Sequence, residues 1–363
     1  MSVPVGLCLG VTCFVSFMLL GSEAAERQGA AVPKTLPPTE IGRRIASLPN
    51  YAHFGFSGVA FDADRLYVTT NIGLIEVQGT SVKSLHSWYL RDDVLEWPWA
   101  DRASKSLWLQ HIHDGVLRRL DETGWHLVAL PAPPNAYGYY TRGDMVAGFH
   151  VTSDATGLHL VGADHVWTWS PPDRWILDTS PSAPEYSGSV GVAFSRGREA
   201  RIMRLGSCFG GPLPCDYAFY WRNGQDWSEP RTLPMTRPSQ ILGTADGVFA
   251  RDDKGELVRL DDESAVVLET PGKCEAVALT SSGKLMASFV GAGVFTLTSD
   301  GWTKILDSPY GPSEGEHRAY LAEKDGTVAY ATDGKLENSG TTALWVAEGG
   351  RWTRIDVEHA AKN

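Results

Sequence analysis

The sequence lacks several signatures by which enzymes are often recognised. No Gly-x-Ser-x-Gly pentapeptide occurs, and "GYYTRGD" (138–144) is not a variant of it, so no nucleophile elbow is predicted. Glycine-rich phosphate-binding motifs are also absent, because the 38 glycines are spread through turns. We therefore expect no bound cofactor, and the sequence does not identify a reaction.

An excess of basic residues is missing as well. The chain has 32 Lys and Arg against 43 Asp and Glu, a formal net charge of −11. Nucleic acid and anionic lipid both favour a basic surface, so neither is expected as a partner.

Long apolar runs are missing after the first twenty residues. Residues 3–20 are almost wholly apolar and uncharged, and small residues follow at Ser22 and Ala24. This pattern predicts a signal peptide over residues 1–24 and a secreted or periplasmic protein without a membrane segment after cleavage. The segment has no Lys or Arg before it, so an uncleaved anchor remains the alternative. A lipoprotein is less favoured, because Cys8 and Cys13 lie inside the apolar run.

Cysteine is scarce in the remaining chain. In "CFGGPLPC" a compact loop separates Cys208 from Cys215, and an oxidising compartment would close it as a disulfide bond. Cys274 is left over, and we expect it to be free and buried in a strand, since no nearby feature would stabilise a thiolate.

No amphipathic helix is evident in the sequence. One short sequence motif, by contrast, recurs along the chain. "LDETGWHLVALP" (120–131) and "LTSDGWTKILDSP" (297–309) share a polar turn, a Gly-Trp pair, an alternating apolar run and a proline. Looser copies occur at 173, 225 and 350, and a degenerate copy begins at Glu263 with Ala265 near the tryptophan position. Such internal similarity is typical of a repeat architecture.

Each copy closes a unit of four predicted strands joined by turns, most of which contain glycine. The units fall at about 53–88, 95–130, 144–180, 190–234, 238–270, 274–308 and 317–357. Seven such units predict an all-β fold, a seven-bladed β-propeller of four-stranded antiparallel blades. A β-sandwich is the alternative, but it would lack this period.

The recurring tryptophan has a structural explanation in this fold. At the start of the outermost strand it would cover the edge of its blade and pack on the next blade. Alternating apolar residues would then place the core in layers between blades. In the second unit, Pro98 must lie at a sheet edge or a bend.

Residues 51–363 are thus predicted to form one propeller domain, preceded by a linker over residues 25–50. Residues 25–38 look like a mobile linker. Residues 41–48, "IGRRIASL", offer a further strand that would help to close the ring.

Two family resemblances support this interpretation. "DRLYVTTNIGLIEVQGTSV" (64–82) resembles the periplasmic propeller repeats of two-component sensor proteins, and "KSLWLQHIHDGVLRRLDETGW" (105–125) is similar to it. No histidine kinase domain follows, so signalling output is not implied. The turn from Ser299 to Trp302 resembles a shortened Asp box of sialidases, a structural turn that does not imply their activity.

In a four-stranded blade, two kinds of connection gather on one face: those between blades, and those between the second and third strands. Propeller functions usually lie on such loops. We expect that face to carry residues 86–93, 111–114, 131–144, 181–189, 207–216 and 309–319.

Two of these loops supply the predicted ligand-binding residues. Tyr137, Tyr139, Tyr140 and Arg142 offer aromatic faces and a forked donor, which suit a sugar or an aromatic ligand. His111, His113 and Asp114 share a strand end, but His-x-His lacks the further ligands of a specific metal site, so no metal is predicted. Alternatively, both groups are ordinary channel-lining or surface residues.

Carbohydrate cleavage would need two carboxylates facing each other across the substrate. The sequence offers acids on the predicted face but does not show which converge: Asp92, Asp93, Asp144, Glu185, Glu314 and Glu316. The favoured hypothesis is therefore an exported propeller that binds a small molecule, a carbohydrate or a protein partner without catalysis. A carbohydrate-active hydrolase or lyase is the rival, and a structural or assembly role is the third alternative.

Overall fold

The computed structural model describes most of the chain after its N-terminal segment. The described residues are 32–48, 54–62, 64–87, 97–101, 106–110, 116–129, 131, 150–154, 157–161, 166–170, 174–178, 189–205, 216–224, 226–310, 318–333 and 342–357. Within these ranges no helix is long and apolar enough to cross a membrane. The predicted signal peptide lies outside them.

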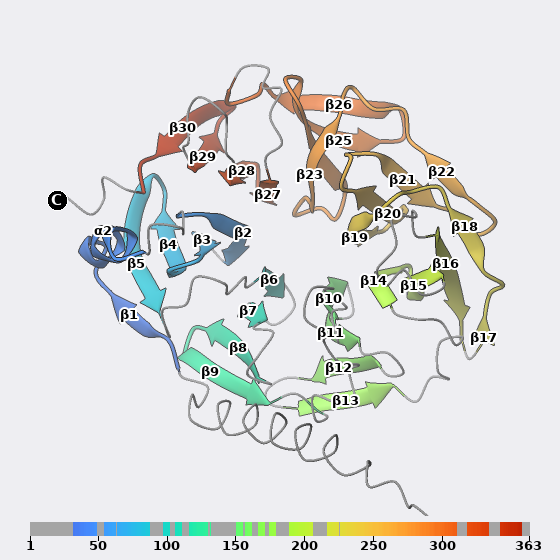
Figure 1. Cartoon of the computed structure of the whole chain (residues 1–363), viewed down its shortest axis with the longest axis horizontal. Helices are drawn as coiled ribbons and strands as arrows, with labels where there is room; N and C mark the ends of the chain where they lie inside the picture. Colours follow the sequence, from blue (N-terminus) through green and yellow to red (C-terminus); the bar gives the residue numbers. More distant parts are fainter. Residues whose placement is uncertain are drawn as a thin grey trace, which may run out of the picture.

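Seven antiparallel sheets follow one another around a ring, so the seven-bladed β-propeller is confirmed (Figure 1). Each blade is a meander whose first strand lies near the centre of the ring and whose last strand lies at the rim (Figure 1). The four-stranded part of every blade falls, to within one residue at its ends, inside a unit that the sequence predicted.

The first four blades are built as follows. Blade 1 consists of β2 (Phe56–Asp62), β3 (Arg65–Thr70), β4 (Gly73–Gln78) and β5 (Ser81–Ser87). Blade 2 consists of β6 (Trp97–Asp101), β7 (Ser106–Gln110), β8 (Val116–Asp121) and β9 (Gly124–Ala129). Blade 3 consists of β10 (His150–Asp154), β11 (Gly157–Val161), β12 (Val166–Ser170) and β13 (Arg174–Asp178). Blade 4 consists of β14 (Ser189–Ser195), β15 (Arg198–Leu205), β16 (Asp216–Asn223), β17 (Asp226–Trp227) and β18 (Arg231–Leu233).

The other three blades have four strands each. Blade 5 consists of β19 (Pro238–Thr244), β20 (Gly247–Asp252), β21 (Leu257–Leu260) and β22 (Ala265–Val267). Blade 6 consists of β23 (Cys274–Leu279), β24 (Leu285–Phe289), β25 (Gly293–Thr298) and β26 (Gly301–Leu306). Blade 7 consists of β27 (Arg318–Lys324), β28 (Thr327–Asp333), β29 (Ala343–Glu348) and β30 (Arg351–Ile355).

Tight hairpins join the strands because the sequence supplies the residues that such turns require. Asp325 and Gly326 connect β27 to β28, and both have positive φ, 50° and 85°. A two-residue turn of this kind needs φ > 0 at both positions, which glycine adopts without strain and aspartate tolerates. The Asp-Gly pair therefore fixes the register of this hairpin.

The apolar core lies between blades, as predicted. Seven clusters of buried side chains each draw on two neighbouring blades, and one of them joins blade 7 back to blade 1. Because each blade buries both sheet faces against its neighbours, the ring is held by its interfaces rather than by one central core.

The predicted strand at residues 41–48 is wrong, and so is the expectation that the chain has no amphipathic helix. This segment forms α2 (Thr39–Ala46), and the linker also contains β1 (Lys34–Leu36), which pairs with β5 as a fifth strand of blade 1. Ile41 and Ile45 lie one helical turn apart and pack into the cluster between blades 1 and 7. Ile41 is fully buried. A helix outside the rim therefore covers this interface (Figure 1).

Pro98 lies in β6, the inner edge strand of blade 2, and faces Leu109 of β7. The expectation that it occupies a sheet edge is confirmed, since an edge strand tolerates a residue without an N–H. Gly58 of blade 1 leaves room for it: a Cβ there would lie 2.4 Å from Pro98 Cδ.

The recurring tryptophans lie at the start of outer strands, but in blades 6 and 7 they pack on the preceding blade and not on the next one, whereas Trp227 packs on a cluster of its own blade. Trp302 Nε1 donates to the Glu269 carbonyl of blade 5 at 3.0 Å, and Trp352 Nε1 donates to the Asp307 carbonyl of blade 6 at 2.7 Å. The outer strand of each of these blades begins near the end of the outer strand of the preceding blade. The indole at its start therefore contacts the blade that comes before it in the sequence. Blade 1 has Val82 at this position, paired with Val77, and α2 covers its interface with blade 7 instead.

Candidate functional site

Every blade has two edges that differ in their connections. In blade 6, Cys274, Phe289 and Gly293 are register partners at one edge, where β24 continues into β25 and the chain enters from blade 5. We call this the loop-bearing edge. The opposite edge, where the first strand meets the second and the third meets the fourth, is the turn-bearing edge.

The predicted ligand-binding residues belong to connections at the loop-bearing edge. In blade 2, Gln110 pairs with Leu117, and Val116 pairs with Ala129, so these strand ends share one edge. The segment with His111, His113 and Asp114 joins β7 to β8. The segment with Tyr137, Tyr139, Tyr140 and Arg142 joins β9 to β10. These seven residues lie outside the described residues, so their convergence stays a prediction.

Several other residues named in the sequence analysis also lie outside the described residues. The candidate acids on the predicted face, Asp92, Asp93, Asp144, Glu185, Glu314 and Glu316, lie outside the described residues, as do Cys208 and Cys215. Cys274 is free and fully buried, as predicted. Burial raises the pKa of its thiol to about 12, so it is not a nucleophile at neutral pH.

One polar cluster is described beside the loop-bearing edge, at the interface between blades 6 and 7. Glu275 is the second residue of β23, and its carboxylate accepts hydrogen bonds from Tyr310 Oη at 3.1 Å and from Tyr330 Oη at 2.9 Å. The two phenol oxygens are also in hydrogen-bond contact, and Trp345 packs against both rings. Tyr310 belongs to the predicted loop 309–319.

The electrostatics of this cluster limit its chemistry. Burial, followed by the charge of Glu275, raises the pKa of Tyr310 and of Tyr330 above the ordinary phenol value. Both phenols therefore stay protonated at neutral pH, where they can donate a hydrogen bond but cannot act as bases. The cluster suits a polar, hydrogen-bonding ligand better than proton abstraction.

Sequence reasoning found only part of this cluster. Tyr310 lies in the loop 309–319 that was expected on this face but was not itself singled out, and Glu275 and Tyr330 lie in strands that were interpreted only as parts of an alternating pattern. The position of Glu275 near the start of an inner strand could have indicated the cluster, because the ends of the inner strands lie around the channel.

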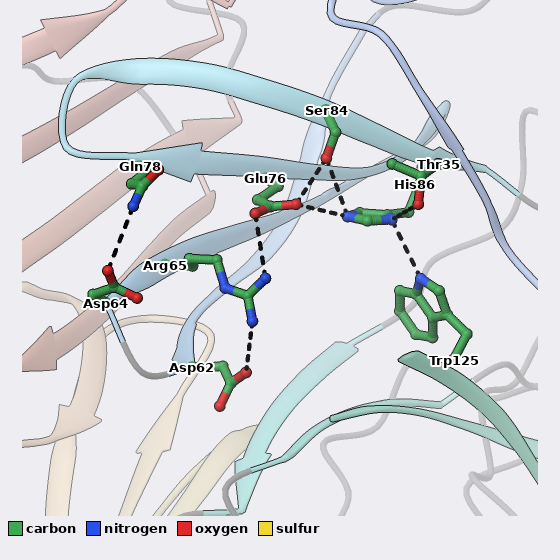
Figure 2. Close-up of polar contacts among 9 residues, drawn as sticks. All are labelled: Thr35, Asp62, Asp64, Arg65, Glu76, Gln78, Ser84, His86 and Trp125. Atoms are coloured by element: carbon green, nitrogen blue, oxygen red, sulfur yellow. Dashed lines mark hydrogen bonds and ion pairs between the residues drawn. The ribbon is translucent and has the colours of Figure 1, made fainter. Parts of the chain in front are cut away.

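A second polar network lies on the flank of blade 1 (Figure 2). Glu76 of β4 accepts from Ser84 Oγ at 2.8 Å and lies 3.1 Å from His86 Nε2. Arg65 reaches the other Glu76 oxygen at 3.5 Å. The hydrogen bonds from His86 and Ser84 outweigh burial and hold the pKa of Glu76 well below its usual value, at about 2.

A cavity of about 370 Å³ lies next to the turn-bearing edge, between blades 6 and 7. Glu323 in its wall accepts hydrogen bonds from the Ser281 N–H and hydroxyl and from the Gly326 N–H. These hydrogen bonds link the turn between β23 and β24 in blade 6 to the turn between β27 and β28 in blade 7. The carboxylate of Glu323 therefore stabilises the interface between these two blades. Its remaining lining is mixed, with Lys284, Thr296, Ile305, Leu306 and Val328.

Metal binding has no support within the described part of the chain, where no three His, Cys, Asp or Glu residues form a group that could hold an ion. The possible His111 and His113 ligands are outside that part.

Comparison with known proteins identifies the fold. No known protein family matches the sequence, and no curated protein does either. A catalytically inactive variant of virginiamycin B lyase from Staphylococcus aureus, solved with quinupristin, is similar in structure with a TM-score of 0.52. It is 12% identical, and the match covers 83% of this chain and 96% of that one.

Two further solved structures show the same likeness. A selenomethionine form of the lyase has a TM-score of 0.50 and 11% identity, covering 88% of this chain and 97% of that one. The extracellular domain of a putative hybrid two-component system from B. thetaiotaomicron has a TM-score of 0.48 and 12% identity, covering 92% of this chain and 42% of that one. At such identities the likeness to the two lyase structures concerns the fold alone. The seven-bladed β-propeller of this chain follows from its own sheets.

Proposed function

We propose that this protein is an exported propeller that binds a ligand or a protein partner on its loop-bearing edge, without catalysis. The observation that carries the proposal is the length of the connections at that edge. The connection from Ala129 to His150 and the connection from Asp178 to Ser189 are far longer than the one from Leu233 to Pro238, which joins blades 4 and 5 equally well. Connections longer than ring closure requires are where binding residues usually lie.

The chemistry of these connections supports a carbohydrate as the first ligand class to test. Tyr137, Tyr139 and Tyr140 offer faces for stacking on a sugar ring, and Arg142 offers paired donors to hydroxyl or carboxylate oxygens. His111 and His113, with Asp114, would add donors and acceptors from the neighbouring connection. The Glu275 cluster provides similar groups between blades 6 and 7.

A carbohydrate-active hydrolase or lyase on the same edge is the second candidate. The observation that favours it is the carboxylate of Glu275 between two protonated phenols, since such phenols can serve as proton donors. Glycoside cleavage needs a second carboxylate across the substrate. The binding function needs no such partner and is therefore preferred.

Affinity electrophoresis tests the proposal directly. The protein is run through native gels that contain soluble neutral or acidic polysaccharides, and we expect at least one polysaccharide to slow its migration. Arg142→Ala should weaken that binding by about 1–3 kcal/mol while leaving the thermal transition unchanged. Arg351→Ala, an exposed arginine at the turn-bearing edge of blade 7, is the matched control and should bind like the parent protein.

The alternative outcomes are distinct. Unchanged migration of the parent protein in every gel would reject carbohydrate as the ligand class. Release of reducing ends or unsaturated products from the polysaccharide would favour the enzyme. Unfolding of Arg142→Ala would make Arg142 a structural brace.

A further inference from the structure

The rim contact between blades 1 and 2 differs chemically from the contacts between blades 5 and 6 and between blades 6 and 7. Trp302 and Trp352 donate to backbone carbonyls. Trp125 Nε1 instead donates to a side chain, Nδ1 of His86, at 3.2 Å (Figure 2). The indole N–H is a donor with no acceptor capacity, so Nδ1 must present a lone pair for this bond to form.

The other ring nitrogen has the opposite requirement. His86 Nε2 lies 3.1 Å from Glu76 Oε2, and an ionised carboxylate can only accept. The low pKa of Glu76, about 2, keeps it ionised at any pH of interest. The contacts of His86 therefore select the neutral tautomer that carries its proton on Nε2.

We propose that His86 is an acid-sensitive switch in the rim contact between blades 1 and 2, an inference independent of the proposed function. Protonation of Nδ1 turns the acceptor of the Trp125 N–H into a competing donor, so this hydrogen bond is lost. The bond to Glu76 survives and strengthens. The bond to Thr35 Oγ1, 3.1 Å from Nδ1, also survives, because a hydroxyl can accept as well as donate.

The selectivity of the switch follows from these partners. β1, which carries Thr35, keeps its attachment to His86 in both states, and only the indole of blade 2 loses its acceptor. His86 is 5% exposed and Trp125 is half-buried, so the released indole N–H is the group that gains access to water. Ser87, the next residue, ends β5, so the switch lies beside the connection from blade 1 to blade 2.

The charges around His86 come from several elements. Glu76 on β4 favours the imidazolium, whereas two guanidinium groups oppose it: Arg65 on β3, which contacts Glu76, and Arg44 on α2, which donates to Ser87 Oγ at 2.6 Å. Further titratable or charged groups lie on these elements: Lys83 on β5 itself, Lys34 on β1, Tyr67 on β3, Asp62 on β2, Glu40 and Arg43 on α2, and Arg118, Arg119, Asp121, Glu122 and His126 on the blade 2 hairpin. Histidine side chains commonly change charge between about pH 5 and 8.

The indole N–H signals in a proton–nitrogen correlation spectrum report the switch. As the pH is lowered through that range, the Trp125 signal should shift and its exchange with water should accelerate about tenfold. The signals of Trp302 and Trp352 should stay in place, since backbone carbonyls do not titrate. A Trp125 signal that does not move, or three signals that move together, would overturn the proposal.

Two histidine variants isolate the responsible group. In His86→Gln, the amide oxygen can accept from Trp125 at every pH while the amide nitrogen donates to Glu76, so the Trp125 signal should no longer titrate. His126→Gln changes a neighbouring histidine that bonds to Asp121, and it should leave the titration intact. A titration that persists in His86→Gln would assign it to another group.

The tautomer is a further test that needs no variant. Nitrogen chemical shifts of His86 in the unmodified protein at neutral pH should show protonated Nε2 and bare Nδ1. A proton on Nδ1 at neutral pH would contradict the proposal, even if His86→Gln failed to fold.

Discussion

The two edges of the propeller differ in the length of the connections that they carry. At the turn-bearing edge short hairpins suffice: Asp325 and Gly326 join β27 to β28, and Ser299 and Asp300 join β25 to β26. At the loop-bearing edge the chain runs from Ser87 to Trp97, from Ala129 to His150 and from Leu306 to Arg318 before the next blade begins. Hairpins of only two residues thus occur at one edge, whereas these connections at the other edge are longer than closure of the ring requires.

The connections at the loop-bearing edge also differ in length from one another. Between blades 4 and 5 the connection runs from Leu233 to Pro238, and between blades 5 and 6 from Val267 to Cys274. Among the connections between blades, the longest leave blades 1, 2, 3 and 6. Because a ring can be closed by short connections, we infer that the functional surface lies over these blades and not over blade 5.

The largest expected effect comes from disturbing the scaffold next to the turn-bearing edge. A Cβ at Gly243 would lie 1.8 Å from the Phe194 carbonyl oxygen of blade 4, so Gly243→Ala should destabilise the protein by about 3 kcal/mol or more. Gly272→Ala is the control, since its Cβ would meet nothing closer than 3.6 Å. Equal thermal transitions for the two variants would contradict the described packing between blades 4 and 5.

Glu76 should make a smaller, pH-dependent contribution to stability. Its folded pKa of about 2 lies below the reference value of 4.5, so its stabilisation is complete above pH 4.5 and is lost as the pH falls toward 2. Glu76→Gln should therefore cost about 2–3 kcal/mol at neutral pH and reduce the loss of stability on acidification. Denaturant unfolding at several pH values measures this.

The exposed Glu263 provides a control for that experiment, and Glu263→Gln should retain the acid dependence of the parent protein. An unchanged dependence in Glu76→Gln would show that the network of Figure 2 does not stabilise the fold.

The tryptophans at the rim should contribute less to the stability of the fold than Glu76 does. Trp302→Phe keeps an aromatic ring but removes the donor to the Glu269 carbonyl, so a loss of about 1 kcal/mol is expected. Binding at the loop-bearing edge should not change. A loss of binding with intact stability would place function at the rim and would undermine the division between the two edges.

The smallest effect concerns cysteine. Thiol labelling of the folded, unreduced protein should find no accessible group, because Cys274 is fully buried and Cys208 and Cys215 are predicted to be bridged. Two or more reactive thiols would reject the bridge and weaken the case for an oxidising compartment.

The fold was predictable from the sequence because the same pattern is written seven times. Alternating apolar residues and glycine turns set the strands, so "RLYVTT" and "GLIEVQ" became β3 and β4 with the expected bounds. Because the pattern recurs, a strand whose own sequence is ambiguous can be placed by comparison with the other units. Even the degenerate unit with Ala265 was therefore placed correctly.

Features that occur once were harder to predict. The helix α2 is short and contains Gly42, and its apolar stripe of Ile41 and Ile45 is equally compatible with a strand. The direction in which the tryptophans pack depends on how outer strands follow one another around the rim, which alternation does not encode. The cluster of Glu275, Tyr310 and Tyr330 joins three segments that are distant in sequence.

The distance between two connections shows whether the predicted ligand-binding residues share one surface. Spin labels placed through His113→Cys and Arg142→Cys would report the separation of the β7–β8 and β9–β10 connections, with Cys274 too buried to react. We expect a main population of distances within roughly 20 Å, the span of a ligand site plus the labels. A main population well beyond that distance would contradict this expectation.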